Sequence, residues 1–236
     1  MSDPRIIVPL DFSEPQQALE LVEKLQADLC RLKVGKELFT KSGPILVEKL
    51  IAKGFDVFLD LKFHDIPTTV AKACAVAADL GVWMINVHAS GGSEMMLRAK
   101  EEIEKKTHHP LLIGVTILTS MNEETLRELG LECSVEEQVA RLAQLTSDAG
   151  LDGVVCSAQE VKGLRNQLGK EFKLVTPGIR PSGSNNDDQK RVMTPAQAIE
   201  AGSDYLVIGR PITQAVDPIQ VLKDIEKEIS AASIKV

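Results

Sequence analysis

Short apolar runs alternate with longer amphipathic runs along the whole chain. The short runs are almost continuously apolar, which is typical of parallel strands that are covered on both faces. The longer runs repeat apolar residues at the helical period, as at Leu19, Val22 and Leu25. The predicted strands are Ile6–Leu10, Arg31–Val34, Phe55–Phe63, Trp83–Val87, Leu111–Leu118, Gly153–Cys156, Lys173–Thr176 and Tyr205–Ile208. The predicted helices are Pro15–Leu29, Pro44–Ala52, Pro67–Leu80, Ser93–Lys105, Val135–Ala149, Ala158–Leu168, Pro195–Ala201 and Pro218–Ser230.

Eight strand–helix units in 236 residues fit the size of a (β/α)8 barrel. A doubly wound open sheet is the competing α/β architecture, and it usually carries a glycine-rich fingerprint after its first strand. Here Asp11-Phe-Ser-Glu-Pro15 follows that strand instead. Because no linker divides the chain, we expect a single TIM-barrel domain over residues 1–236.

Composition and charge narrow the function classes. Hydrophobic residues make up 44% of the chain, which is enough for a sizeable core and argues against disorder. The formal net charge is −7 with no cluster of Lys or Arg, so a nucleic-acid partner is not expected. The chain has neither a signal-peptide pattern nor an apolar stretch of the ~20 residues that span a bilayer. We therefore expect a cytoplasmic protein without a membrane partner.

The four cysteines support neither a metal site nor a disulfide framework. None forms a Cys-x-x-Cys pair, and no histidine-rich spacing accompanies them. Each lies in an apolar or helical run, as a small core residue in a reducing compartment would. We expect no bound metal.

Charged residues gather where the first three predicted strands end. Asp11 follows the first strand, Lys33 lies on the second, Asp60 and Lys62 lie on the third, and Asp65 comes just after it. Barrel enzymes place their chemistry at these carboxyl ends. Charges inside buried strands are costly unless they are paired, and residues two apart on a strand face the same side. The pattern predicts a site in which the lysines and aspartates meet.

The loops after the seventh and eighth predicted strands carry arginines. Arg180 follows Gly178-Ile179, and Arg210 follows Gly209. TIM barrels often bind phosphate with these two loops. Glycine lets a ligand approach the backbone, and the planar guanidinium matches phosphate oxygens. The polar segment 181–190 follows on the same face, so the sequence predicts a phosphate site here.

The segment Asp60-Leu-Lys62-Phe-His-Asp65-Ile-Pro67 resembles the signature of the orotidine 5′-phosphate decarboxylases. The resemblance extends along the chain to further segments: Asp11, Lys33, Leu118-Thr119-Ser120, Pro177-Gly178-Ile179-Arg180-Pro181 and Ile208-Gly209-Arg210.

The resemblance implies catalytic roles for four residues. Lys62 is expected to donate a proton to carbon 6 of the pyrimidine, with Asp60 beside the departing carboxylate. Lys33 is expected to connect Asp60 to the ribose. Asp65 is expected to reach into the partner's site, in a homodimer with shared active sites. The remaining substrate contacts implied are Asp11 and Thr69 at the ribose, Thr119 or Ser120 at the base, and Arg180, Gln189, Gly209 and Arg210 at the phosphate, with residues 181–190 as a closing loop.

The activity implied is that of a carboxy-lyase, which converts orotidine 5′-phosphate to uridine 5′-phosphate in pyrimidine biosynthesis. Loss of carbon dioxide leaves a carbanion, which most decarboxylases delocalise into an organic cofactor or a metal. A fixed ammonium can stabilise that charge and supply the proton. We therefore expect no cofactor.

Two alternatives fit parts of the pattern. A 3-keto-L-gulonate 6-phosphate decarboxylase has the same fold, but that family needs magnesium and carries an acidic residue where this chain has Lys33. A non-catalytic phosphate-binding barrel would have no reason to hold Asp60 and Lys62 together.

Overall fold

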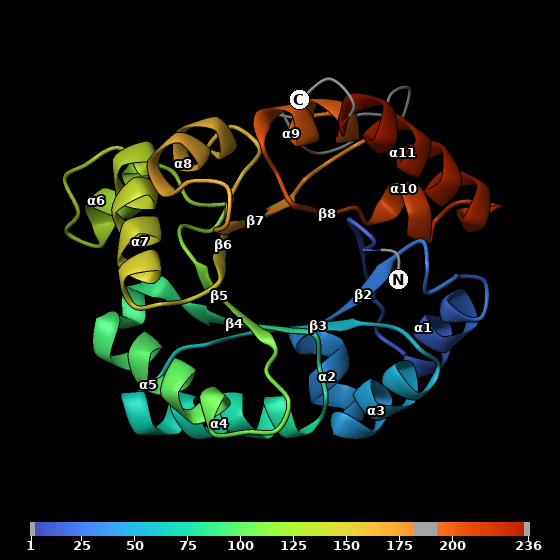
Figure 1. Ribbon diagram of the computed structural model, residues 1–236, viewed down its shortest axis with the longest axis horizontal. Helices are drawn as coiled ribbons and strands as arrows, with labels where there is room; N and C mark the ends of the chain where they lie inside the picture. Colours follow the sequence, from blue (N-terminus) through green and yellow to red (C-terminus); the bar gives the residue numbers. More distant parts are fainter. Residues whose placement is uncertain (1–2, 182–192, 234–236) are drawn as a thin grey trace.

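A computed structural model describes residues 3–181 and 193–233 of the chain. Eight parallel strands form a closed barrel in which each strand pairs with its neighbour in the sequence and β1 pairs with β8 (Figure 1). The strands are β1 (Ile6–Pro9), β2 (Arg31–Gly35), β3 (Val57–Phe63), β4 (Met84–His88), β5 (Leu111–Val115), β6 (Gly153–Val155), β7 (Lys173–Pro177) and β8 (Tyr205–Val207). The predicted (β/α)8 fold is confirmed.

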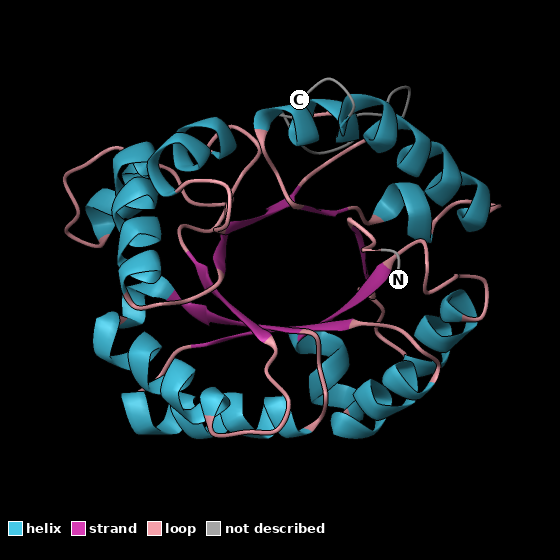
Figure 2. Ribbon diagram, viewed as in Figure 1, coloured by secondary structure: helices cyan, strands magenta, loops and turns pink. Residues whose placement is uncertain are grey.

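Helices surround the barrel on all sides, as Figure 2 shows. They are α1 (Pro15–Val22), α2 (Lys36–Ser42), α3 (Pro44–Ala52), α4 (Pro67–Asp79), η1 (Ala89–Gly91), α5 (Ser93–Glu104), α6 (Glu123–Glu128), α7 (Val135–Asp148), α8 (Val161–Leu168), α9 (Pro195–Ala201), α10 (Arg210–Thr213) and α11 (Pro218–Ser233). Within the described ranges, no helix is long and apolar enough to cross a membrane.

The barrel interior is filled with side chains. Ile7, Phe58, Met84, Ile113 and Val175 are buried and pack together across it. Since side chains alternate along a strand, residues two positions further on point into the same interior, nearer the carboxyl ends. Lys33 lies two residues after Arg31 on β2, and Asp60 lies two residues after Phe58 on β3. Both are among the charged residues that were predicted to form a site. The strand register therefore places them at the carboxyl-terminal end of the barrel.

The structure differs from the predicted elements in several places. The first helix ends at Val22 rather than at Leu29, because the chain then forms a series of turns that still bury Leu25. The fifth strand ends at Val115, whereas the prediction extended it to Leu118. The short helices α2, α6 and α10 were not predicted, because two turns of helix or less carry too little periodicity to stand out.

The amino-terminal end of the barrel is closed by paired charges and aromatic rings. The guanidinium of Arg31 lies 4.0 Å from the ring centre of Trp83 and 5.2 Å from that of Tyr205. The same group binds Asp3 at 2.8 Å and Asp56 at 3.0 Å. This cation is therefore satisfied both by carboxylates and by aromatic faces, at the end of the barrel opposite Lys33 and Asp60.

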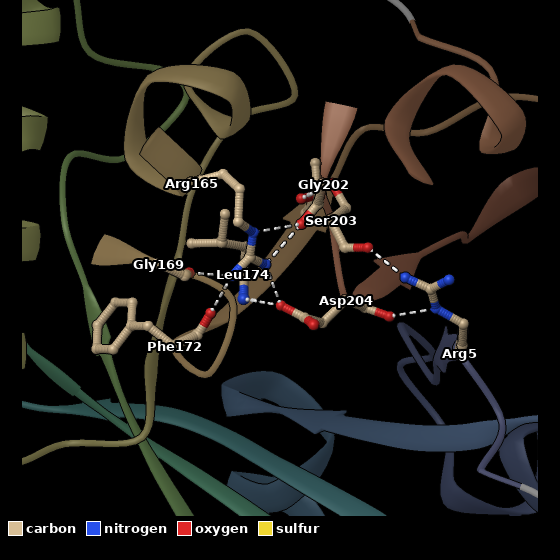
Figure 3. A network of polar contacts seen from close by, with 9 residues as sticks. Arg5, Arg165, Gly169, Phe172, Leu174, Gly202, Ser203 and Asp204 are labelled. Carbon is tan, nitrogen blue, oxygen red and sulfur yellow. Dashed lines mark hydrogen bonds and ion pairs between the residues drawn. The ribbon is translucent and has the colours of Figure 1, made fainter. Parts of the chain in front are cut away.

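A second arginine ties α8 to the start of β7 and β8 (Figure 3). Arg165 donates to Asp204 Oδ2 at 2.6 Å and to the carbonyls of Gly169, Phe172 and Gly202. The same carboxylate oxygen accepts the Leu174 N–H at 2.7 Å. The network lies at the amino-terminal end of the strands, opposite the charged site.

Replacing Arg165 with methionine is expected to lower the free energy of unfolding by about 2–4 kcal/mol, because Asp204 and three carbonyls lose their donor. The turnover number should change by less than about twofold, since the network lies away from the catalytic end. Urea unfolding and steady-state kinetics measure the two effects. An unchanged midpoint and slope would contradict the role given to Arg165.

Candidate active site

Two lysines and one carboxylate form the centre of the charged site. Asp60 on β3 lies between them: its Oδ2 is 3.2 Å from Lys33 Nζ, and its Oδ1 is 2.5 Å from Lys62 Nζ. Asp60 and Lys33 are 8% and 9% exposed. The predicted convergence of Lys33, Asp60 and Lys62 is therefore present in the structure.

Opposing effects act on the Asp60 carboxyl. Burial alone raises its pKa, but attraction to Lys33 and Lys62 and hydrogen bonds from Lys62 and Asn86 outweigh burial. The net result is a pKa below the ordinary value, so Asp60 is ionised at neutral pH.

Lys62 stands in an irregular part of β3. Its φ angle is 52°, which makes it the one residue other than glycine with positive φ within residues 3–181 and 193–233. The pairing with β4 shifts register here, from Leu59 opposite Ile85 to Phe63 opposite Val87. A backbone of this kind costs of order 1–3 kcal/mol and is found most often at functional sites. The irregularity aims the Lys62 ammonium at Asp60.

Asn86 on β4 spans this irregularity, and it was not among the site residues predicted from the sequence. Its side chain is fully buried, donates to Asp60 Oδ1 at 2.7 Å and accepts the Lys62 backbone N–H at 2.8 Å. The available signal was a single polar residue inside the apolar run Met84-Ile-Asn-Val. A buried polar group normally has a partner, so this residue could have been linked to the neighbouring Asp60.

A cavity of about 130 Å³ opens onto the two lysines and Asp60. Its remaining walls are largely apolar, and they include Phe58, Val115, Ile117, Val175 and Val207. Charges act more strongly beside apolar walls than in water, because the local dielectric constant is lower. The cavity therefore combines a cationic end with a poorly hydrated wall.

A larger cavity of about 650 Å³ adjoins the first and shares Ile117, Leu118, Thr119, Ser157 and Pro177 with it. Ligand sites commonly have volumes of this size. Thr119 lines both cavities, whereas Ser120 lines the larger one. Of the two residues expected at the base, Thr119 is thus the one beside the charged cluster.

Asp11, Asp65 and Thr69 are three further residues that the sequence placed at the site. Asp11 is 3.3 Å from Lys33 Nζ and largely exposed. Asp65 and Thr69 are also exposed. The Asp65 carboxylate accepts the backbone N–H of Ile66 at 2.6 Å, and Lys62 contacts Asp60 instead. The structure therefore does not bring Asp65 into the cluster of its own chain.

Arg180 lies close enough to Arg210 to be affected by its positive charge. Burial lowers the pKa of Arg180 first, and the positive charge of Arg210 lowers it further. Arg210 begins α10, directly after Gly209, where an added Cβ would lie 3.2 Å from the Pro9 side chain. Gln189 and most of segment 181–190 lie outside the described residues.

The last long helix, α11, begins at Pro218, as the sequence predicted, and the four-residue α10 lies between it and Gly209. Such a short helix has little macrodipole, so any attraction of phosphate here depends on the arginines.

Two histidines lie beside the cluster. The rings of His64 and His88 are 5.4 Å apart. Burial lowers the pKa of His88 first, and His64, Lys36 and Lys62 lower it further. His88 is therefore neutral at neutral pH. Within the described part of the chain, no group of three or more His, Cys, Asp or Glu residues is arranged to hold a metal.

The chain was compared with known proteins. A family model described as "Orotidine 5'-phosphate decarboxylase / HUMPS family" matches residues 4–225. The orotidine 5′-phosphate decarboxylase of Saccharophagus degradans is 61% identical over 232 residues, which cover 98% of both chains. That of Pseudoalteromonas translucida is 62% identical over 226 residues, with 95% of this chain and 97% of the relative covered. The crystal structure of the Lactobacillus acidophilus orotidine 5′-phosphate decarboxylase superposes with a TM-score of 0.87 at 40% identity, and the match covers 96% of this chain and 99% of that one.

Proposed function

The chain belongs to the orotidine 5′-phosphate decarboxylase / HUMPS family, and from this premise we propose that it converts orotidine 5′-phosphate to uridine 5′-phosphate and carbon dioxide without a cofactor. The observation that carries the proposal is the buried Asp60 carboxylate held between the ammonium groups of Lys33 and Lys62. It supports a reaction in which negative charge develops beside Lys62. The relatives at about 60% identity support the same substrate.

In the proposed reaction the bond between carbon 6 and the carboxylate breaks, and its electron pair stays on carbon 6. Lys62 then transfers a proton from Nζ to that carbon, and solvent reprotonates the amine. Its ammonium stabilises the carbanion before the proton moves, because it is already fixed in place by Asp60. Asp60, beside the substrate carboxylate, adds repulsion that carbon dioxide loss relieves.

Other residues orient the nucleotide. Lys33, which binds both Asp60 and Asp11, is placed to connect the reacting end with the ribose hydroxyls. Thr119 lines the charged cavity and is placed to contact the base, with Ser120 beside it. Arg180, Gly209 and Arg210 are proposed to bind the phosphate, together with Gln189. The proximity of two arginine cations supports a dianionic ligand in this corner.

We also propose a homodimer with shared active sites. Asp65 and Thr69 are exposed, and Asp65 does not contact Lys33, Asp60 or Lys62 of its own chain. Their exposure supports a role in the active site of a second subunit. Nearby apolar side chains are open as well, since Ile66 is 66% and Val76 62% exposed. Four free cysteines and a role in pyrimidine biosynthesis support a cytoplasmic location.

Mixing two damaged variants tests the shared site. In a mixed dimer of Lys62→Ala and Asp65→Ala chains, one site holds both substitutions and the other holds neither. Equal amounts that exchange subunits at random should recover about a quarter of the wild-type activity, since half of the dimers are mixed and one of their two sites works. Mass spectrometry measures the mixed dimers, and their presence without activity would rule out sharing.

The substrate is tested by mixing the purified protein with orotidine 5′-phosphate and following the ultraviolet absorbance of the pyrimidine. We expect an absorbance change that ends at the spectrum of uridine 5′-phosphate, and no turnover of 3-keto-L-gulonate 6-phosphate with added magnesium. If the protein turned over 3-keto-L-gulonate 6-phosphate but not orotidine 5′-phosphate, the proposed activity would be wrong and the sugar-phosphate decarboxylase activity would replace it. The presence of Lys33, where that activity is expected to need an acidic residue, argues against this outcome.

A further inference from the structure

The irregular segment of β3 is held in place by a single side chain from β4. Three residues of β3, from Asp60 to Lys62, lie between the pairs Leu59–Ile85 and Phe63–Val87, where β4 has Asn86 alone. Backbone pairing cannot satisfy both strands across such a mismatch. The Asn86 carboxamide takes over this function, because its oxygen accepts the Lys62 N–H and its nitrogen donates to Asp60 Oδ1.

The two hydrogen bonds of Asn86 serve different parts of the site. The bond to Lys62 fixes a backbone that a lysine rarely adopts, with φ at 52°. The bond to Asp60 reaches the same oxygen, Oδ1, that binds Lys62 Nζ. Since Asn86 does not line either cavity of the described site, it reaches the substrate only through these two residues.

We propose that Asn86 is a positioning residue, which keeps the Asp60 carboxylate ionised between the two ammonium groups and holds Lys62 in its bulged conformation. The part of this inference that concerns turnover rests on the proposed decarboxylation. The charged and titratable groups around Asp60 are Lys33 on β2, Lys62 on β3 and His88 on β4, with Asp11 bound to Lys33.

Replacing Asn86 with leucine keeps a similar volume and removes both hydrogen bonds. We expect kcat to fall by about 10- to 100-fold, as for the loss of one hydrogen bond to a charged group. The KM for orotidine 5′-phosphate should change by less than about threefold. Because the lost donor favours the ionised carboxyl, the acid limb of the kcat profile should move to higher pH.

Replacing Asn86 with aspartate separates the two hydrogen bonds. The introduced carboxylate can still accept the Lys62 N–H, but it faces Asp60 where a donor stood at 2.7 Å. Two adjacent carboxylates cannot both ionise easily, so the acid limb should move further than in the leucine variant. If Asn86 served only to accept the Lys62 N–H, the aspartate variant would keep the wild-type kcat and pH profile.

Thr176→Val is the matched control. Thr176 is fully buried on β7 and hydrogen-bonded to Ser203 at 2.8 Å, yet its neighbours Val175 and Pro177 are the residues that face the cavity. This variant should lose stability by an amount comparable to that lost by the leucine variant. Its pH profile should stay that of the wild type.

The direct readout is the titration of the Asp60 carboxyl carbon by ¹³C NMR in the wild-type, Asn86→Leu and Asn86→Asp proteins. We expect the pKa of Asp60 to rise in both variants, and this measurement needs no turnover. Inactive wild-type protein with the expected titration would therefore refute the proposed function alone. An unchanged Asp60 titration, or a kcat loss matching that of Thr176→Val without a pH shift, would overturn the role of Asn86. If one variant fails to fold, the other decides the same question.

Discussion

The Lys62→Ala variant is expected to lose at least about 100- to 1,000-fold in kcat, while its unfolding midpoint stays near that of the wild type. The Lys62 ammonium lies 2.5 Å from Asp60 Oδ1, beside the cavity where we place the reacting carbon. Its removal takes away the charge that stabilises the carbanion and the proton that quenches it. The loss should exceed that of a single electrostatic contact, because two steps depend on the same group.

Steady-state kinetics with orotidine 5′-phosphate measure this effect, and Arg165→Met serves as a control for changes that affect the fold alone. The Lys62→Arg variant offers a further comparison, since it keeps the positive charge but holds its proton far more tightly. It should also be severely impaired if proton transfer contributes. Near-normal turnover in Lys62→Ala would remove Lys62 from the mechanism.

The second large effect is expected at Arg210, far along the sequence from the reacting charges. Arg210→Ala should reduce kcat/KM for the nucleotide by about 100- to 1,000-fold, as for the loss of a charge-assisted phosphate contact. The same change should affect the reaction of orotidine, which lacks the phosphate, by less than about threefold. Binding energy from a remote group can be used to order and dehydrate the reacting end, so the effect should also appear in kcat.

Added phosphite provides a second test of whether binding at the phosphate site accelerates the reaction. It should partly restore the reaction of orotidine by occupying the phosphate site, and the restoration should be lost in Arg210→Ala. Equal damage to the nucleotide and the nucleoside reactions would instead mean that Arg210 has a structural role.

The barrel could be predicted from the sequence because the pattern that indicates each strand or helix lies within the residues of that element. Near-continuous apolar strands alternate with amphipathic helices, and each unit gives the same signal in its own part of the chain. The meeting of Lys33 and Asp60 followed from the rule that the carboxyl ends of parallel strands lie at one face of the barrel. The contact between Asp60 and Lys62 was predicted from the alternation of side chains along a regular strand, whereas the structure forms it through a bulge at Lys62.

Asn86 and the bulge beside it could not be predicted in the same way. The bulge depends on the register between β3 and β4, which is set by two strands separated in the sequence. The local pattern shows one polar residue inside an apolar run, but it does not show which residues of β3 lie opposite Asn86. The prediction for the end of α1 was wrong for a related reason, because the turn after Val22 still buries Leu25, which continued the helical period of apolar residues.

Fixed lysine ammonium groups, rather than a metal or an organic cofactor, are proposed to accomplish the decarboxylation. The most direct test is the rate of uridine 5′-phosphate formation from orotidine 5′-phosphate by purified protein dialysed against EDTA. The two ammonium groups at Asp60 already supply the positive charge that the carbanion needs. We therefore predict an unchanged rate, with one carbon dioxide released for each nucleotide formed. A rate that falls on dialysis and returns with magnesium would contradict the account.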